Sequence, residues 1–200
     1  MARRGAGDYR RHLRVAEGGW ARREDDEREH VRGHPVDTDM IVEIHAGSHN
    51  KYEMDHRRGR IRLDRTLFTA TTYPADYGYV PDTLADDGDP IDAMVLLDAP
   101  TFPGCVVRVR PIGMFWMYDE HGPDAKLLCV PAADPRWRAV NGLAELPEHM
   151  LNEIGHFFDI YKDLEPGKHT DVRGWRDRPE AEAILTEARS RHRASIRTSG

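Results

Sequence analysis

Short segments of alternating or continuous apolar residues run through the first two thirds of the chain, which is the pattern of β-strands. From Asp39 onward, MIVEIH, KYEMDH and RIRLDR are separated by the turn residues AGSHN and RRG. Three longer runs follow, AMVLLDAP, VVRVRPIGMFWMYD and DAKLLCVP. His121-Gly122-Pro123 is typical of a hairpin turn that joins Asp119 to Asp124. Residues 39–131 therefore predict an antiparallel sheet closed into a small barrel.

The end of the chain changes to a helical period. In LPEHMLNEIGHFFDIYKDLE the apolar positions share one helical face, and Gly167 would end this helix. These positions are Leu151, Ile154, Phe157, Phe158 and Tyr161. Pro179 to Arg191 predicts a second helix with apolar residues on one face. The expected class is α+β, a β-barrel with two C-terminal helices packed outside.

Residues 1–37 differ from the rest because they are dense in Arg, Asp and Glu and poor in aliphatic residues. They predict a disordered extension, or a short charged helix around Ala21 to Val31, with no catalytic role. The run is Arg-rich like a transit peptide, but its acidic residues argue against one. An alternative is a true start nearer Met40. The expected domain spans residues 38–200.

The totals narrow the class of protein. A chain of 200 residues suits one domain, and its net charge of −6 disfavours a general attraction to nucleic acid or anionic membranes. No apolar run approaches the ~20 residues that span a bilayer, and no signal-peptide core is visible, so we expect a cytoplasmic protein. Cys105 and Cys129 lie in strand-like contexts and are expected to be reduced, buried thiols.

The sequence DDGDPID, Asp86 to Asp92, places four carboxylates within seven residues, directly before an apolar strand. Like charges repel at close range, and a desolvated carboxylate is costly unless a positive group meets it. Either this loop is fully solvated or a cation belongs there. Asp119, Glu120 and Asp124 form a second acidic cluster on the predicted hairpin.

Several strands also carry charged residues on a side that should face inward or toward the rim of the barrel. Packing does not explain so many inward charges, whereas a site at one mouth of the barrel does. The residues are Glu43, Lys51, Glu53, Arg65, Asp92, Asp119, Asp124 and Lys126.

These residue types indicate phosphoryl chemistry. Carboxylates without a cluster of His or Cys suit Mg²⁺, Mn²⁺ or Ca²⁺ rather than zinc, and several carboxylates suggest several ions. The cations and tyrosine hydroxyls then need an anion, as in phosphoryl transfer. They are Lys51, Arg65, Lys126, Lys162, Tyr73, Tyr77 and Tyr161.

Each charge alone could be a solvated surface residue, and the tyrosines could serve packing. The acidic run does not fit an EF-hand, and Gly167-Lys168 does not complete a P-loop.

From about Asp39 to Arg191 the chain resembles the soluble family I inorganic pyrophosphatases, most closely the bacterial type. Asp87 to Ala93, DGDPIDA, fits the family pattern D-x-D-P-x-D. Further matching segments are VEI at Val42–Ile44, KYE at Lys51–Glu53, LDR at Leu63–Arg65, YPADYGY at Tyr73–Tyr79, DEHGPDAK at Asp119–Lys126, HFFDIYKDLEPGK at His156–Lys168 and GW at Gly174–Trp175. The family usually has Pro after VEI, where this chain has His45.

The resemblance implies a five-stranded OB-like closed barrel that hydrolyses pyrophosphate with several Mg²⁺ ions, for which Mn²⁺ or Zn²⁺ are possible substitutes. It implies Asp89 as the general base, and Arg65, Lys126 and Tyr77 as further catalytic residues. The implied metal ligands are Glu43, Glu53, Asp87, Asp92, Asp119 and Asp124. The implied pyrophosphate ligands are Lys51, Arg65, Tyr77, Lys126, Tyr161 and Lys162. It also implies a homo-oligomer, commonly a hexamer.

Some alternatives stay open. The barrel could be a nucleic-acid-binding module, although the acidic mouth and the negative net charge disfavour it. It could also be a Mg²⁺-dependent phosphoesterase for a larger organic phosphate, but no pocket for a base or a sugar is evident. We expect Asp86 to point outward. His56 and His121 lie near predicted site residues and either tune the site or are surface residues.

Overall fold

The computed structural model describes residues 36–198. The predictions for residues 1–35, including the helix around Ala21 to Val31, lie outside the described residues. The strands are β1 (Thr38–Ile44), β2 (Asn50–Asp55), β3 (Arg60–Thr66), β4 (Asp76–Tyr79), β5 (Asp92–Val95), β6 (Val106–Asp119), β7 (Gly122–Pro131) and β8 (Thr170–Asp177). The α-helices are α2 (Glu148–Ile160) and α3 (Arg178–Thr198), and two 3₁₀ turns cover Pro135–Trp137 and Leu143–Glu145.

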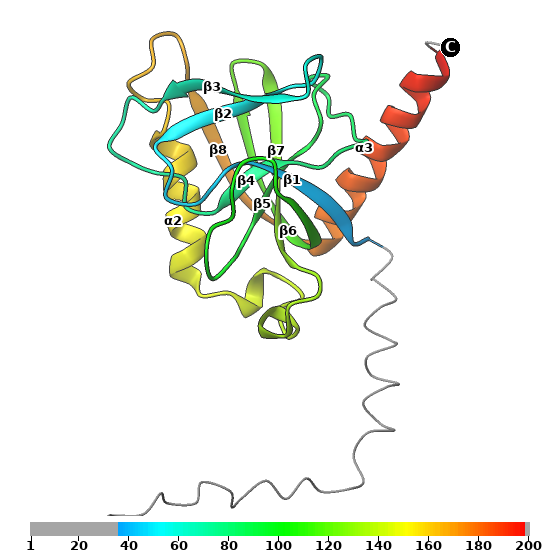
Figure 1. The fold of residues 1–200 in the computed structure, drawn as a ribbon. Helices are drawn as coiled ribbons and strands as arrows, with labels where there is room; N and C mark the ends of the chain where they lie inside the picture. The colour runs from blue at the N-terminus through cyan, green and yellow to red at the C-terminus, as the bar shows by residue number, and fades with distance from the viewer. Residues whose placement is uncertain (1–35, 199–200) are drawn as a thin grey trace, which may run out of the picture. The chain divides into compact units, whose positions relative to one another are not determined.

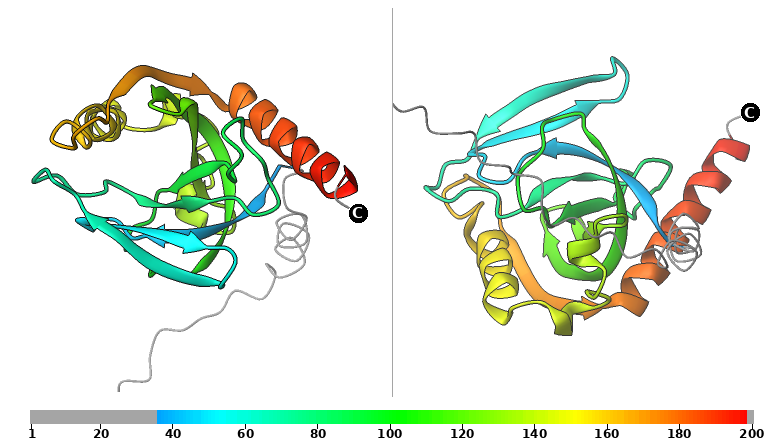
Figure 2. Two further views of the ribbon diagram at one scale, coloured as in Figure 1. Left: turned by 90° about the horizontal axis from the view of Figure 1, so that it is seen from above. Right: turned by 60° about the horizontal axis from the view of Figure 1, so that its bottom comes forward.

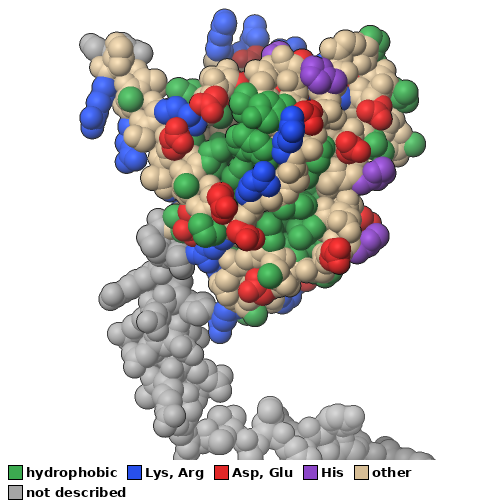
Figure 3. Space-filling view, turned by 180° about the vertical axis from the view of Figure 1, so that it is seen from behind, with side chains coloured by type: hydrophobic (Ala, Val, Ile, Leu, Met, Phe, Trp, Pro, Cys, Tyr) green, Lys and Arg blue, Asp and Glu red, His purple; other side chains and the backbone are tan. Residues whose placement is uncertain are grey.

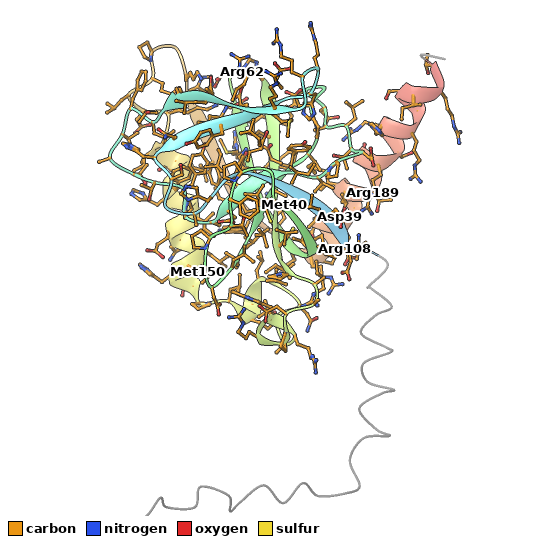
Figure 4. All side chains as sticks on the ribbon, viewed as in Figure 1. Asp39, Met40, Arg62, Arg108, Met150 and Arg189 are labelled. Carbon is orange, nitrogen blue, oxygen red and sulfur yellow. The ribbon has the colours of Figure 1, made fainter. Side chains whose placement is uncertain are left out.

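Six strands form a mixed sheet in the order β1-β4-β5-β7-β6-β8, and β1 also pairs with β6 (Figure 1). Five strands therefore pair in a ring. Where β1 pairs with β6, Asp39 lies opposite Arg108 in register and forms an ion pair of 3.3 Å with it (Figure 4). The ring is uneven, because β4 and β5 have four residues each and β6 has fourteen. Closure into an OB-like barrel stays a prediction.

The sequence predicted an antiparallel sheet, and this was wrong for one pair of strands. β5 pairs with β7 in parallel, with Asp92 opposite Lys126, whereas the other pairings are antiparallel. The reason is the long strand β6, which lies between β5 and β7 in sequence but on the far side of β7 in the sheet. The chain therefore returns to β5 in the same direction. This parallel pair brings an aspartate and a lysine side by side.

The segments β2 and β3 form a separate two-stranded hairpin, rather than part of one continuous sheet as predicted. Lys51 pairs with Arg65, and the register shifts by one residue directly after Lys51. The hairpin lies across the strands of the larger sheet (Figures 1 and 2). It thereby carries charged residues of its own to the same place as those of the sheet.

Two strands were not predicted from the sequence. All four residues of β4 are buried, so they show no alternation of apolar and polar positions. Gly78 in this strand allows a close approach of backbones, because a Cβ there would lie 2.0 Å from the carbonyl oxygen of Ile41. The other strand, β8, pairs with β6 at the edge of the sheet and carries Trp175.

The two predicted helices are present and lie at opposite sides of the strands (Figure 2). Ile154, Phe157 and Phe158 of α2 are buried, as the period predicted. Burial of each such side chain stabilises the fold by roughly 1.5–3 kcal/mol. On α3, the face that contains Ala181 and Leu185 is buried against a second apolar cluster. Neither of these described helices is long and apolar enough to cross a membrane.

Both cysteines are free thiols, as predicted. Cys129 is fully buried, and this burial raises the pKa of its thiol. Cys105 is only partly buried, so the prediction of a buried side chain was wrong for this residue. It directly precedes β6, where the chain enters the sheet from a loop.

Candidate active site

A cavity of about 460 Å³ opens between the hairpin β2–β3, the sheet and the turn after α2. All thirteen residues that the sequence predicted as site residues line it. They are Glu43, Lys51, Glu53, Arg65, Tyr77, Asp87, Asp89, Asp92, Asp119, Asp124, Lys126, Tyr161 and Lys162. The structure thus brings together residues from β1 through the turn after α2, while their individual roles stay predictions.

Lys126 is a buried lysine that lines this cavity. Its side chain is only 2% exposed, and it donates hydrogen bonds of 2.8 Å to Asp92, 2.7 Å to Asp124 and 2.9 Å to the hydroxyl of Tyr77. That hydroxyl in turn donates to Asp92. Burial opposes the charge of Lys126, but Asp124 and Asp92 raise its pKa well above the ordinary value. A fully charged lysine is therefore held between two carboxylates.

Three carboxyl groups on the cavity hold their protons more tightly than usual. Burial raises the pKa of Glu43 to about 7, although the backbone N–H of Met54 donates to it over 2.6 Å. Burial also raises the pKa of Asp124 against the opposing effect of Lys126. The pKa of Asp89 is raised by burial and by the neighbouring charges of Asp87 and Asp92. These shifts are the expected result of crowding carboxylates in a partly closed space.

The turn between β6 and β7 meets the end of α2 through Lys162. This lysine donates 2.9 Å to Asp119 and 3.1 Å to Glu120. Burial acts to raise the pKa of Asp119, but the hydrogen bonds from Lys162 and from the backbone of His121, together with the charge of Lys162, outweigh it and lower the pKa below the ordinary value. The backbone N–H of His121 adds a further hydrogen bond of 2.8 Å to Asp119. Asp119 is therefore ionised under ordinary conditions.

The hairpin supplies a third group of ion pairs. Lys51 pairs with Glu53 across one strand, and it lies 3.6 Å from Asp64 on the other. Arg65 contacts Asp64 and, through a second nitrogen, Glu165 at 2.8 Å. The predicted cations Lys51 and Arg65 thus come from the hairpin. The other two, Lys126 and Lys162, come from β7 and from the turn after α2.

The donor set fits hard divalent cations, because the six predicted metal ligands offer only carboxylate oxygens. Within residues 36–198, no three His, Cys, Asp or Glu side chains are gathered tightly enough to hold an ion in the conformation seen. The carboxylates of Asp92, Asp119 and Asp124 instead point to the ammonium groups of Lys126 and Lys162. Divalent metal cations and the ammonium groups of these lysines would therefore compete for the same carboxylate oxygens.

Other residues near the site were judged differently from the sequence. Asp64, Glu120 and Lys168 line the cavity but were not predicted as site residues. The available signal for Asp64 was its position in the LDR segment. It directly precedes Arg65, which is the strand partner of Lys51. Lys168 was considered as a P-loop residue and as the end of the family-like segment His156–Lys168. A positive charge in the turn that already carries Lys162 was the available signal.

Tyr73 does not line the cavity; it is buried and packs against Tyr77 and Phe157, so the packing alternative holds for this residue. Asp86 lies outside the cavity and pairs with Arg191 of α3, as the outward orientation predicted. His56 and His121 both line the cavity. Whether they tune the site stays a prediction.

Comparisons with known proteins agree on one family. The family model described as inorganic pyrophosphatase matches residues 40–193. The inorganic pyrophosphatase of Streptomyces coelicolor is 55% identical over 156 residues, which cover 78% of this chain and 96% of that protein. The protein of the same name from Methanosarcina mazei is 52% identical over 153 residues, covering 76% and 90%.

Solved structures give the same result. The inorganic pyrophosphatase of Thermus thermophilus superposes with a TM-score of 0.78 at 45% identity, covering 80% of this chain and 92% of that chain. The enzyme of Helicobacter pylori gives a TM-score of 0.77 at 41% identity, covering 78% and 94%. The mixed sheet and the two C-terminal helices are thus shared with both.

Proposed function

The chain belongs to the inorganic pyrophosphatase family, and from this premise we propose a Mg²⁺-dependent hydrolysis of pyrophosphate to two orthophosphates with Asp89 as the general base. The protein is accordingly a hydrolase of the phosphoanhydride bond. One observation carries the proposal: predicted metal-binding carboxylates and predicted phosphate-binding cations share a single cavity. Carboxylates alone would suit a cation store, and cations alone would suit an anion carrier, whereas phosphoryl transfer needs both.

The chain's cations bind and orient the substrate in this proposal. Pyrophosphate oxygens would be held by Lys51, Arg65, Tyr77, Lys126, Tyr161 and Lys162. Charge-assisted hydrogen bonds from lysine and arginine to phosphate are short and strong. As the bridging P–O bond breaks, the leaving phosphate gains negative charge, and the same groups stabilise that charge. Their burial increases the effect, because water screens it less.

Asp89 takes the proton of the attacking water. The water oxygen forms a new bond to one phosphorus, its proton passes to the carboxylate, and the bond from that phosphorus to the bridging oxygen breaks. The second phosphate departs with the bridging oxygen. The raised pKa of Asp89, which results from burial and from Asp87 and Asp92, supports this role. A base whose pKa lies closer to neutrality accepts a proton more readily.

Metal ions would be held by Glu43, Glu53, Asp87, Asp92, Asp119 and Asp124. Of these, Asp87, Asp92 and Asp124 would form the tighter site, and Asp119 would join Asp124 for an ion that arrives with the substrate. When bound, Mg²⁺ supplies a lower pKa for the attacking water and neutralises phosphate charge. Lys126 and Lys162, which contact Asp92, Asp124 and Asp119, would donate to phosphate oxygens when these carboxylates hold ions.

Two other functions are weaker. A nucleic-acid-binding module would need a basic groove, whereas this cavity carries many carboxylates and the chain has a net charge of −6. A phosphoesterase for a larger organic phosphate would need room and contacts for a base or a sugar. The cations aimed into the cavity favour a small, highly charged substrate instead.

The test compares substrates and metals in one assay of phosphate release. We expect fast release from pyrophosphate with Mg²⁺, little release after Mg²⁺ is removed with EDTA, and slow release from ATP under the same conditions. Faster release from ATP than from pyrophosphate would contradict the substrate. Unchanged release from pyrophosphate in EDTA would contradict the dependence on Mg²⁺.

A further inference from the structure

Glu165 is a buried carboxylate that contacts two cations of the cavity without lining the cavity itself. Its side chain is 3% exposed. Its Oε1 atom accepts a hydrogen bond of 2.9 Å from Nε of Arg65 and forms an ion pair of 2.8 Å with Nη2 of the same residue. Its Oε2 atom lies 3.1 Å from the ammonium group of Lys168. Each carboxylate oxygen therefore has its own cation.

The backbone of Glu165 is held as firmly as its side chain. Its N–H donates to the carbonyl oxygen of Lys162 over 2.8 Å, and its own carbonyl accepts from the N–H of Lys168 over 3.2 Å. These bonds form the turn that directly follows α2 and carries Lys162 and Lys168 to the cavity. Both the backbone and the carboxylate of Glu165 are thus held in place directly behind residues that line the cavity.

The ion pair with Arg65 also joins two parts of the chain that are 100 residues apart. Arg65 belongs to the hairpin β2–β3, whose strands pair with each other and not with the larger sheet. The same hairpin carries Lys51, which is opposite Arg65 in register. Glu165 therefore connects the hairpin side of the cavity to the turn after α2.

Arg65 is oriented from two sides by carboxylates of the chain itself. Its Nη1 atom contacts Asp64, and its Nε and Nη2 atoms contact Glu165. A guanidinium group is planar, so fixing these nitrogens fixes the direction in which the rest of the group can donate. A cation that is already ordered loses less conformational entropy when it binds a phosphate oxygen.

We infer that Glu165 is a positioning residue of the active site. It orders Arg65 and Lys168 toward the phosphate oxygens of pyrophosphate and does not contact the substrate. The inference rests on the proposed function, because it assigns these two cations to pyrophosphate. The competing explanation is a purely structural ion pair that anchors the hairpin. The two explanations differ in the expected effect of a substitution at Glu165 on the folded protein. A positioning role predicts a lower kcat/KM, whereas a purely structural ion pair predicts only a lower melting temperature.

The primary variant is Glu165→Gln, which keeps the shape of the side chain but removes its charge. A glutamine offers one acceptor oxygen and one NH₂ group, so it cannot accept from both Arg65 and Lys168. We expect kcat/KM for pyrophosphate to fall roughly 10- to 100-fold, as is usual when a group that orients a site residue is removed. Glu182→Gln is the matched control, because Glu182 pairs with Arg178 on α3 and does not line the cavity.

A double-mutant cycle separates positioning from stability. If Glu165 acts through Arg65, then Glu165→Gln adds little to the loss that Arg65→Lys already causes, since neighbours that act together are not additive. Kinetics are measured below the melting temperature of every variant, and thermal unfolding is recorded for each. The expected result is a loss of kcat/KM in Glu165→Gln, near wild-type kinetics in Glu182→Gln, and a non-additive double variant.

Three outcomes would overturn the inference. The first is an unchanged kcat/KM in Glu165→Gln, even if its melting temperature falls. The second is an additive double variant, which would show that Glu165 does not act through Arg65. The third is a wild type that releases no phosphate from pyrophosphate, in which case the proposed function fails and the inference fails with it. Only this third outcome affects the proposed function.

Discussion

At the scale of single residues, the two most buried lysines of the cavity each contact carboxylates. Lys126 lies between Asp92 and Asp124, and Lys162 contacts Asp119. A buried charge without a partner would cost several kcal/mol, so these pairs make the cavity possible in the first place. The carboxylate of Glu43 has a different environment. Glu43 has no such cation in contact within the described part of the chain, and its pKa is raised.

The raised pKa of Glu43 predicts how the metal-free protein responds to pH. Burial raises this pKa from 4.5 to about 7, so the fold favours the protonated form. The stabilising contribution is complete below pH 4.5 and is lost as the pH rises through about 7. We expect the free energy of unfolding of the metal-free protein to fall between pH 5 and pH 8, by up to about 3 kcal/mol from this group.

Chemical denaturation of the metal-free protein at both pH values measures this effect. Glu43→Gln is the comparison, because the amide keeps the acceptor for the Met54 N–H and cannot ionise. The variant should lose less stability than the wild type between pH 5 and pH 8. Equal losses in both proteins would show that Glu43 does not contribute.

Among the elements, the short strand β4 has the tightest constraint. It pairs with β1 on one side and β5 on the other, and it places Tyr77 in the cavity, where the hydroxyl of this residue donates to Asp92. Gly78 lies so close to β1 that any Cβ would collide with the backbone, at 2.0 Å from the Ile41 carbonyl oxygen and 2.9 Å from the Glu43 nitrogen. A side chain at this position would therefore push β4 and β1 apart next to the site.

Gly78→Ala is expected to destabilise the protein by about 3 kcal/mol and to lower activity, because backbone atoms cannot move aside as a side chain can. Gly155→Ala is the matched control. Gly155 lies in α2, and a Cβ there would meet only Phe115 at an ordinary contact distance of 3.6 Å. Since alanine favours a helix over glycine, this control should gain up to about 1 kcal/mol. Thermal or chemical unfolding of both variants tests the pair, and equal stability in both would contradict the steric account.

The elements that the sequence could predict are those with a clear period. The strands β1, β2, β3, β5, β6 and β7 and both helices follow from alternation or from the helical stripe. The strand β4 was missed because it is buried on both faces and contains a glycine. The parallel pairing of Asp92 with Lys126 could not be predicted either, because it depends on how β6 is placed in the sheet.

The same limit applies to the site. The DGDPID run and the charges on strands identified many of the residues that line the cavity, because charges on core-facing positions have no packing explanation. Glu165 gave no such signal. It lies in a loop, and its importance comes from a partner 100 residues away. Contacts of this kind are visible only in three dimensions.

At the scale of the whole molecule, several large apolar side chains remain exposed. They are Leu63, Phe68, Phe102, Val106, Tyr118, Leu164 and Ile196. Apolar side chains also gather across the middle of the face in Figure 3, between charged groups. Exposed apolar surface of this kind is typical of an interface between proteins. We therefore keep the proposal of a homo-oligomer, with a hexamer as the expected state.

Light scattering coupled to size-exclusion chromatography tests that state. The chain has a mass of 22.9 kDa, and we expect a particle of about six times that mass. Replacing an exposed apolar residue such as Phe102 by a charged one should shift the particle to a smaller mass if that residue lies in an interface. A particle of 22.9 kDa for the wild type would contradict the proposal.

The central claim is hydrolysis of pyrophosphate with Asp89 as the base, and one measurement tests it most directly. Phosphate release from pyrophosphate is followed at saturating Mg²⁺ for the wild type and for Asp89→Asn, which keeps the shape of the side chain but cannot take a proton. We predict rapid release by the wild type and a kcat roughly 10²- to 10⁴-fold lower in the variant. A variant that matches the wild type would contradict the role of Asp89, and a folded wild type that releases no phosphate would contradict the function itself.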